Sequence, residues 1–160
     1  MSIEIERLGL IISKKKQPGV GDNINGPCCI EVPGWCSNKL GRYYLYFSDH
    51  AGTYIKLAYS NQITGPWKIH KGGVLDLSSF YDAYDHIASP DILINNEEQE
   101  LRLYFHSRSR SLGRQQWTFA AVSKNGLTFK PLADKPLAGF YLKVFYWGKK
   151  IYGMSKGGNL

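Results

Sequence analysis

Residues 42–48 read Arg-Tyr-Tyr-Leu-Tyr-Phe-Ser, and residues 102–107 read Arg-Leu-Tyr-Phe-His-Ser. Both runs are rich in aromatic and aliphatic side chains, which favour β-strands. The similarity continues outside these runs, because Pro27 matches Pro90 and the sequence around Ala58 matches that around Ala121. The chain is therefore predicted to contain a repeated, strand-rich unit.

The length of this unit predicts its architecture. A repeat of about 60 residues with four short antiparallel strands is typical of a β-propeller blade. The expected fold class is all-β, an incomplete β-propeller of antiparallel blades within a single domain, 1–160. A single β-sandwich is the alternative, since its strands also alternate and turn. The predicted parts are a leading strand at 3–12, blade 1 at 26–74, blade 2 at 88–132 and part of blade 3 at 138–155.

Two blades and part of a third cannot close a ring. Such an array exposes a blade face and sheet edges, which favour association with other chains. We therefore expect either a homo-oligomer formed through the exposed blade face or further sequence that covers this face.

The distribution of charged and apolar residues along the chain limits which kinds of partner are expected. The net charge of +7 arises mainly from residues 14–16 and from Arg108, Arg110 and Arg114, all in turn-like polar stretches. This pattern favours solvated loops over a nucleic-acid surface, so no nucleic-acid partner is expected. The acidic start lacks the basic and apolar runs of a secretory signal, and no apolar run approaches the ~20 residues that span a bilayer. A cytoplasmic protein without a membrane partner is expected.

The cysteines give no reason to expect a metal. Cys28, Cys29 and Cys36 are odd in number and have no zinc-binding spacing. No phosphate-binding glycine loop is present either. We expect no metal and no cofactor.

Several motifs recur at the expected starts and central strands of the two blades. In the first they are residues 25–27 (Asn-Gly-Pro), 41–47 and 64–67 (Thr-Gly-Pro-Trp), and in the second residues 86–91 (His-Ile-Ala-Ser-Pro-Asp) and 101–105. Together they resemble the first two blades of the family 43 glycoside hydrolases. Because these enzymes are five-bladed β-propellers, the resemblance implies that the chain corresponds to the N-terminal half of such a domain.

The resemblance also implies a chemistry and places it at the blade starts. Enzymes of the family hydrolyse glycosidic bonds with inversion, using one carboxyl group as acid and a second as base. A third carboxylate tunes the pKa of the acid. The matching positions in this chain are Gly26, Ser89 and Ala138. None of the three is acidic, so the usual chemistry of the family is not expected.

Other polar residues lie near the predicted blade starts. These candidate ligand-binding residues, together with one tryptophan that could stack on a sugar ring, are Asp22, Asn25, Trp35, Asp49, His50, Asp85, His86 and Asp91. His50 or His86 is a candidate proton donor, because imidazole titrates near neutral pH. Asp85 or Asp91 is then a candidate base.

Each of these residues also has a structural interpretation. The aspartates can bond turn amides, the two histidines can be structural, and Trp35 can pack between blades. His70 and His106 have no polar company in the sequence and are predicted to be structural.

The sequence leaves three functions open. The first is a carbohydrate-interacting, hydrolase-like propeller protein whose catalysis is lost or undetermined by the sequence. The second is a glycosidase whose active site is completed by another chain or by further sequence. The third is a non-enzymatic interaction or oligomerisation module.

Overall fold

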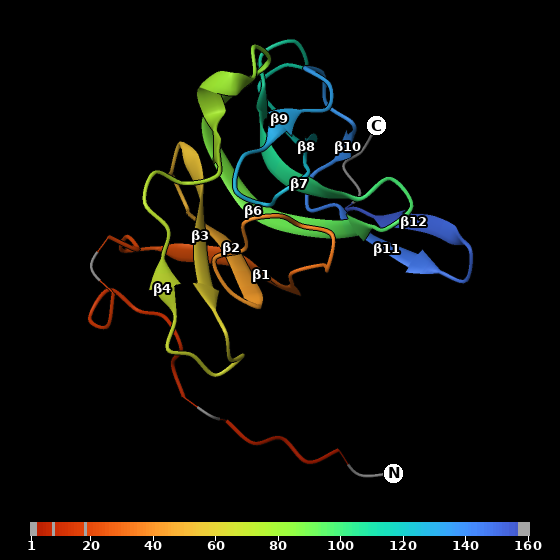
Figure 1. Ribbon diagram of the computed structural model, residues 1–160. Helices are drawn as coiled ribbons and strands as arrows, with labels where there is room; N and C mark the ends of the chain where they lie inside the picture. Colours follow the sequence, from red (N-terminus) through yellow and green to blue (C-terminus); the bar gives the residue numbers. More distant parts are fainter. Residues whose placement is uncertain (1–2, 8, 18, 157–160) are drawn as a thin grey trace.

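The computed structural model describes residues 3–7, 9–17 and 19–156, and it consists of antiparallel strands with one short 3₁₀ helix (Figure 1). The first strands are β1 (Ile24–Glu31), β2 (Tyr43–Asp49), β3 (Tyr54–Ser60), β4 (Lys68–Ile69) and β5 (Leu75–Asp76). The helix η1 (Leu77–Ser79) precedes β6 (Ala83–Asn95), β7 (Glu100–Ser109), β8 (Gln116–Ser123) and β9 (Lys130–Pro131). The last strands are β10 (Ala138–Gly139), β11 (Lys143–Trp147) and β12 (Lys150–Met154). Within the described ranges no helix is long and apolar enough to cross a membrane.

The strands form three separate sheets that follow one another along the chain (Figure 1). Blade 1 has the order β1-β2-β3-β4, with β5 beside β3. Blade 2 has the order β10-β8-β7-β6, with β9 beside β8. The β11–β12 hairpin is a third sheet of two strands. The predicted incomplete β-propeller is confirmed, since successive antiparallel sheets are present and the described part of the chain does not close a ring.

The strand register shows that the repeat detected in the sequence is a structural repeat. Leu45 of β2 lies opposite Ala58 of β3, and Leu103 of β7 lies opposite Ala121 of β8. The two matched pairs of residues therefore occupy equivalent places in the two blades.

Alternate faces of each blade pack on different neighbours, as the period of two in a β-strand requires. Tyr46 of blade 1 and Phe105 of blade 2 belong to the large core between the two blades. The hydroxyl of Tyr46 also donates a hydrogen bond of 2.9 Å to the carbonyl of Gly126. On the other face of blade 2, Tyr104 belongs to a smaller cluster with Val144 of the hairpin. The blades therefore stack in chain order.

Three boundaries differ from the prediction. The expected strand at 3–12 does not form in the described residues of that range, which lack a sheet partner and leave Ile3 and Ile5 more than four-fifths exposed. Blade 2 begins at Ala83, earlier than 88, because β6 continues to pair with β7 on both sides of its bulges. Ala138, expected to start blade 3, pairs with Thr118 and so belongs to the second sheet.

Candidate functional site

The first strands of the two blades, β1 and β6, approach each other closely at Gly26 and Ser89. Gly26 and Ser89 both have left-handed backbone, with φ of 50° and 51°. A Cβ atom on Gly26 would lie only 2.3 Å from the Cα atom of Ser89. Both residues lie at bulges, which bend a strand and redirect its side chains. The two positions that the resemblance assigns to catalytic acids are therefore in contact and carry no carboxylate.

Ser48 links the two strands beside this contact. Its hydroxyl donates a hydrogen bond of 2.7 Å to Oδ1 of Asn25 and accepts one of 3.3 Å from the backbone amide of Ser89. The amide nitrogen of Asn25 lies 3.2 Å from Nδ1 of His50 and can only donate to it. Because Nδ1 of His50 accepts this hydrogen bond, Nε2 carries the hydrogen of the neutral ring. His50 is exposed, so its Nε2 is not used by this contact and is left for another partner.

A second imidazole is held by a carboxylate on β6. Asp85 accepts a hydrogen bond from Nδ1 of His86 and also pairs with the guanidinium of Arg108, 3.2 Å away. Asp85 has a left-handed backbone conformation, with φ of 68°, at the bulged part of the strand. A carboxylate that binds Nδ1 orients the ring and leaves Nε2 as the reactive atom. The Asp85–His86 pair can therefore transfer a proton to or from a bound molecule.

His106 completes this group of imidazoles, although the sequence predicted only a structural role for it. Its ring centroid lies 5.7 Å from that of His86 and 4.5 Å from that of Tyr141. The side chain is buried, and its Nδ1 atom has no hydrogen-bond partner. Burial, and secondly the imidazoles of His86 and His50, lower the pKa of His106 to about 4. The ring is therefore neutral near pH 7 and presents an unsatisfied nitrogen.

A sequence signal for His106 did exist. It follows the repeated Leu-Tyr-Phe run of blade 2, as Ser48 follows that of blade 1. Ser48 contacts the first blade start, and His106 lies opposite Ala88, next to the second. Comparing equivalent positions of the repeat would have placed His106 at the site. We call His50, His86, His106, Asn25 and Asp85 the axial cluster.

Two of the predicted site residues, Asp49 and Asp91, stabilise contacts between segments of the fold and do not belong to the axial cluster. Asp49 pairs with the buried ammonium of Lys56, and its carboxylate lies against Gly21. Asp91 accepts a hydrogen bond of 2.8 Å from Lys143 and another of 3.3 Å from the backbone amide of Val144. Both contacts of Asp91 tie the hairpin to blade 2. The carboxylates of Asp49 and Asp91 are therefore engaged away from the axial cluster.

The remaining two predicted residues lie elsewhere. Asp22 forms an exposed ion pair with Lys14. Trp35 donates a hydrogen bond of 3.0 Å to Asn96, which follows the opposite end of β6 from His86. Trp35 therefore joins the two blades and does not contact the axial cluster.

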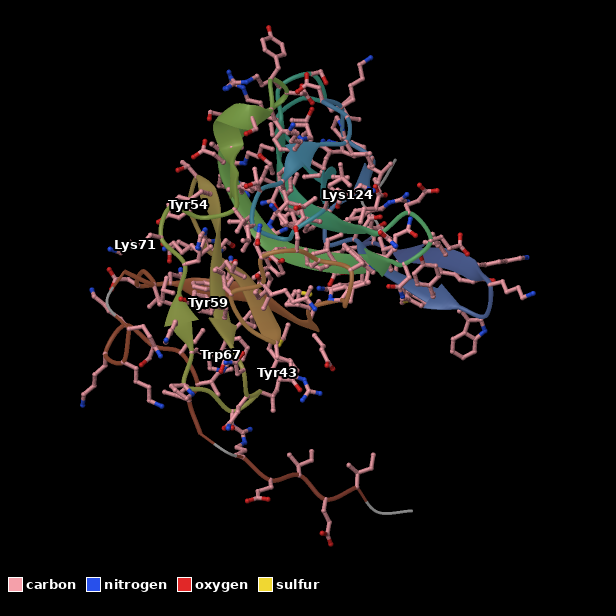
Figure 2. All side chains as sticks on the ribbon, viewed as in Figure 1. Tyr43, Tyr54, Tyr59, Trp67, Lys71 and Lys124 are labelled. Atoms are coloured by element: carbon pink, nitrogen blue, oxygen red, sulfur yellow. The ribbon has the colours of Figure 1, made fainter. Side chains whose placement is uncertain are left out.

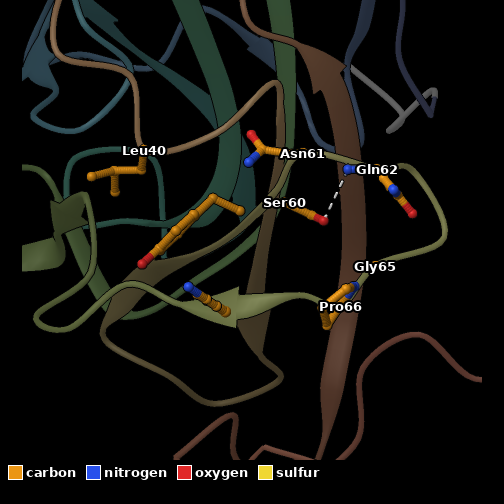
Figure 3. Close-up of a pocket in the computed structure, with 8 residues that line it drawn as sticks. Leu40, Ser60, Asn61, Gln62, Gly65 and Pro66 are labelled. Carbon is orange, nitrogen blue, oxygen red and sulfur yellow. Dashed lines mark hydrogen bonds between the residues drawn. The ribbon is translucent and has the colours of Figure 1, made fainter.

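A hollow at the outer edge of blade 1 is a different feature (Figure 3). It lies between Leu40 and the turn from β3 to β4, where the amide of Gln62 donates to the hydroxyl of Ser60 at 3.1 Å. Trp67 and Tyr59, labelled in Figure 2, lie on the same blade. The residues that line the hollow include no carboxylate and no histidine. It therefore offers hydrogen bonds without the proton-transfer groups of the axial cluster.

The chemistry of the axial cluster is that of hydrogen bonding and proton transfer. Among the residues that the structure describes, no group of three His, Cys, Asp or Glu side chains is arranged to hold a metal ion. Burial raises the pKa of all three cysteine thiols, that of Cys28 to about 11, so these thiols stay protonated near pH 7.

Comparison with known proteins agrees with the fold. No protein-family model matches the chain. A protein of Acanthamoeba polyphaga mimivirus, R118, is 33% identical over 154 residues, and the match covers 86% of this chain. The chain spans only 43% of the length of that relative.

Solved structures that share the fold include glycoside hydrolases. A family 43 β-xylosidase/α-arabinofuranosidase from a compost microbial metagenome superposes with a TM-score of 0.66 at 20% identity, over 84% of this chain and 42% of the enzyme. A family 117 glycoside hydrolase from Zobellia galactanivorans gives 0.65 at 18% identity, over 94% of this chain and 45% of the enzyme. The chain therefore has the β-propeller fold of the family 43 and family 117 glycoside hydrolases, and it corresponds to less than half of such a domain.

Proposed function

We propose that this chain binds a saccharide at the axial cluster and does not by itself carry out hydrolysis with two carboxyl groups. The observation that carries the proposal is the placement of His50 and His86 in one cluster, with Nδ1 of each ring held by Asn25 and by Asp85 so that Nε2 is left for a ligand. The exposed ring of Tyr141 lies nearby, against His106. The Nε2 atom of an imidazole can form a hydrogen bond with a sugar hydroxyl, and an aromatic face suits the apolar face of a sugar ring. The fold shared with glycoside hydrolases supports the same class of ligand.

The carboxylates argue for binding without the usual hydrolysis. An inverting glycosidase needs an acid and a base about 6.5–9.5 Å apart. In the axial cluster the only carboxylate is Asp85, which is already bound by Arg108 and His86. Gly26 and Ser89 cannot supply a second one.

Xylotriose is the first probe to use, because it is the ligand named for the family 43 enzyme from compost. Titration of the chain with xylotriose, followed by NMR chemical shifts, should show saturable binding. His50→Ala and His86→Ala should each weaken it at least tenfold. His70→Ala is the matched control, since His70 lies at the end of β4 and outside the cluster. Equal affinity in all three variants would contradict the proposal.

A second candidate is a glycosidase completed by another chain or by further sequence. The Asp85–His86 pair favours it, because a carboxylate that binds Nδ1 orients the imidazole for proton transfer through Nε2. Hydrolysis of aryl xylosides or arabinofuranosides that disappears in His86→Ala, with xylotriose binding retained, would establish this candidate and refute binding alone. If neither binding nor hydrolysis is found across a broad saccharide panel, the third function, an interaction module, is favoured. The single domain at 1–160 and the cytoplasmic location stay predictions.

A further inference from the structure

Three arginines come together at the end of blade 2 where β6 begins and β7 ends. They are Arg108, Arg110 and Arg114, which the sequence predicted to lie in solvated loops. Arg108 lies opposite Tyr84 in the register of β6 and β7. The guanidinium carbons of Arg110 and Arg114 lie over the ring of Tyr84, 5.0 and 5.9 Å from its centroid. We call the three arginines and Tyr84 the arginine cluster.

Arg110 and Arg114 are positioned without a carboxylate partner. Nε of Arg110 donates a hydrogen bond of 3.0 Å to the carbonyl oxygen of Tyr81, and cation–π contacts with Tyr84 hold both guanidinium groups. In the part of the chain that the structure describes, no carboxylate oxygen lies within 4.0 Å of either guanidinium. Two cations beside one ring repel each other, and a bound anion would remove that repulsion. The terminal amino groups of Arg110 match the paired oxygens of a carboxylate or a similar oxyanion.

Two carboxylates close to the arginine cluster are engaged by other groups. The buried Asp82 accepts hydrogen bonds of 2.6 Å from the hydroxyl of Ser109 and of 2.8 Å from the backbone amide of Ser111. Asp134 accepts a hydrogen bond of 2.6 Å from the backbone amide of Tyr81. These carboxylates therefore order the backbone around the arginine cluster and do not neutralise its charge.

The arginine cluster adjoins the axial cluster. The guanidinium of Arg108 lies 3.2 Å from Asp85, and Asp85 in turn holds Nδ1 of His86. His106 and Arg108 are two residues apart on β7, which pairs with β8 without a bulge, so their side chains lie on one face of the strand about 7 Å apart along it. A saccharide bound to the imidazoles can therefore extend to the arginines.

Arg110 also forms one wall of a hollow of about 590 Å³. The other residues that line the hollow are Ser78, Ser79, Phe80 and Tyr81. The ring of Tyr81 is 83% exposed and offers an aromatic face to a sugar, and the serine hydroxyls can donate hydrogen bonds to an anion. The volume falls within the range of roughly 300–1,000 Å³ that is usual for ligand pockets. The hollow therefore gives room for a charged sugar unit beside Arg110.

We infer, on the basis of the proposed function, that the saccharide is acidic and that its carboxylate or sulfate group binds Arg110 and Arg114. A neutral saccharide would leave the two guanidinium groups without a partner. A nucleic acid carries the same kind of charge, but it is usually bound by cations that follow its backbone along a groove. The arginine cluster is instead one compact group beside the imidazoles, so an acidic saccharide fits it better.

Isothermal titration calorimetry of the whole chain with three forms of xylotriose tests the inference. They are unsubstituted xylotriose, xylotriose with one glucuronic acid branch, and the methyl ester of that branch. The acid and the ester have the same sugar skeleton and differ in charge, so the acid should bind about tenfold more tightly, and the difference should shrink as the salt concentration rises. Xylotriose with one sulfate ester, compared with the acid, shows which anionic group is preferred, and either preference supports the inference.

The variant Arg110→Gln/Arg114→Gln should bind the acid and the ester with affinities within about twofold of each other and should keep its affinity for xylotriose. Both side chains are exposed, so the circular dichroism of the variant should be unchanged. Lys71→Gln/Lys149→Gln is the matched control, because it removes two positive charges from exposed positions elsewhere, and it should keep the preference for the acid.

Three results would overturn the inference. They are equal binding of the acid and the ester by the wild-type chain, an equal loss of the preference in both double variants, and tighter binding of a single-stranded RNA oligonucleotide than of the acid that is lost with the two arginines. The first result, with xylotriose binding retained, leaves the proposed function untouched. If no form of xylotriose binds, the proposed function fails and the inference fails with it.

Discussion

The contact between Gly26 and Ser89 can be tested by adding one methyl group, in the variant Gly26→Ala. The new Cβ would lie 2.3 Å from the Cα atom and 2.7 Å from the Cβ atom of Ser89. The first of these is a backbone atom, so a change of side-chain rotamer cannot relieve the clash. The two blades would have to move apart at their closest point.

The magnitude follows from two terms. A left-handed backbone costs a residue with a Cβ about 1–2 kcal/mol more than glycine. Overpacking by an added methyl group costs about 1–3 kcal/mol. Their total, about 2–5 kcal/mol, is a large share of the roughly 5–15 kcal/mol that stabilises a typical domain. A loss of about 3 kcal/mol lowers the Tm of a chain of this size by roughly 6–12 °C.

Urea denaturation followed by tryptophan fluorescence and circular dichroism measures the loss. Gly113→Ala is the matched control, because Gly113 has a φ of 69° and no atom within 4 Å of its would-be Cβ. It shares the backbone strain without the contact and should lose only about 1–2 kcal/mol. Equal losses in the two variants would refute the close approach of the blades. Gly26→Asp adds the same Cβ and further atoms, so it should destabilise the chain at least as much as Gly26→Ala.

Two further predictions concern buried groups that can carry a charge, the ammonium of Lys56 and the imidazole of His106. Lys56→Met leaves the carboxylate of Asp49 without its cation and should lower the free energy of unfolding by about 3–5 kcal/mol. Lys14→Met removes one partner of an exposed ion pair and should change the free energy of unfolding by less than about 1 kcal/mol. Similar losses for the two variants in urea denaturation would contradict the difference in burial between the two ion pairs. Because the pKa of His106 is lowered to about 4, its unfolded state binds the extra proton below about pH 6.5, so stability is present above that pH and is lost as the pH falls towards 4. His106→Phe should make the free energy of unfolding less dependent on pH in this window, and His70→Phe should not; an unchanged slope in both would count against the buried neutral imidazole.

Much of the fold could be predicted because its signals are local. The Leu-Tyr-Phe runs became the central strands β2 and β7, and the matched alanines paired with them in register. Alternation along a strand and turn residues between strands are visible in a few consecutive residues. The strand expected at 3–12 failed because alternation alone does not supply a partner strand, and β1 begins only at Ile24.

The site was predicted less completely because it depends on contacts between the blades. His50, His86, Asp85 and Asn25 were identified from their places near the blade starts, and the structure brings them into one region. His106 was predicted to be only structural, although it holds the repeat position equivalent to Ser48, because its contacts with His86 and Tyr141 form only in the folded chain. Nearness to a blade start in the sequence was therefore not sufficient to identify every residue of the axial cluster.

By itself, the sequence determined that the chain forms repeated antiparallel sheets and that Gly26, Ser89 and Ala138 are not acids. The tertiary structure decided which polar groups come together where the two blades meet. It directed Asp91 to Lys143 at the joint between blade 2 and the hairpin. The physical reason is that strand formation depends on neighbouring residues, whereas burial, hydrogen bonding and pKa depend on residues that only the packing of blades brings together.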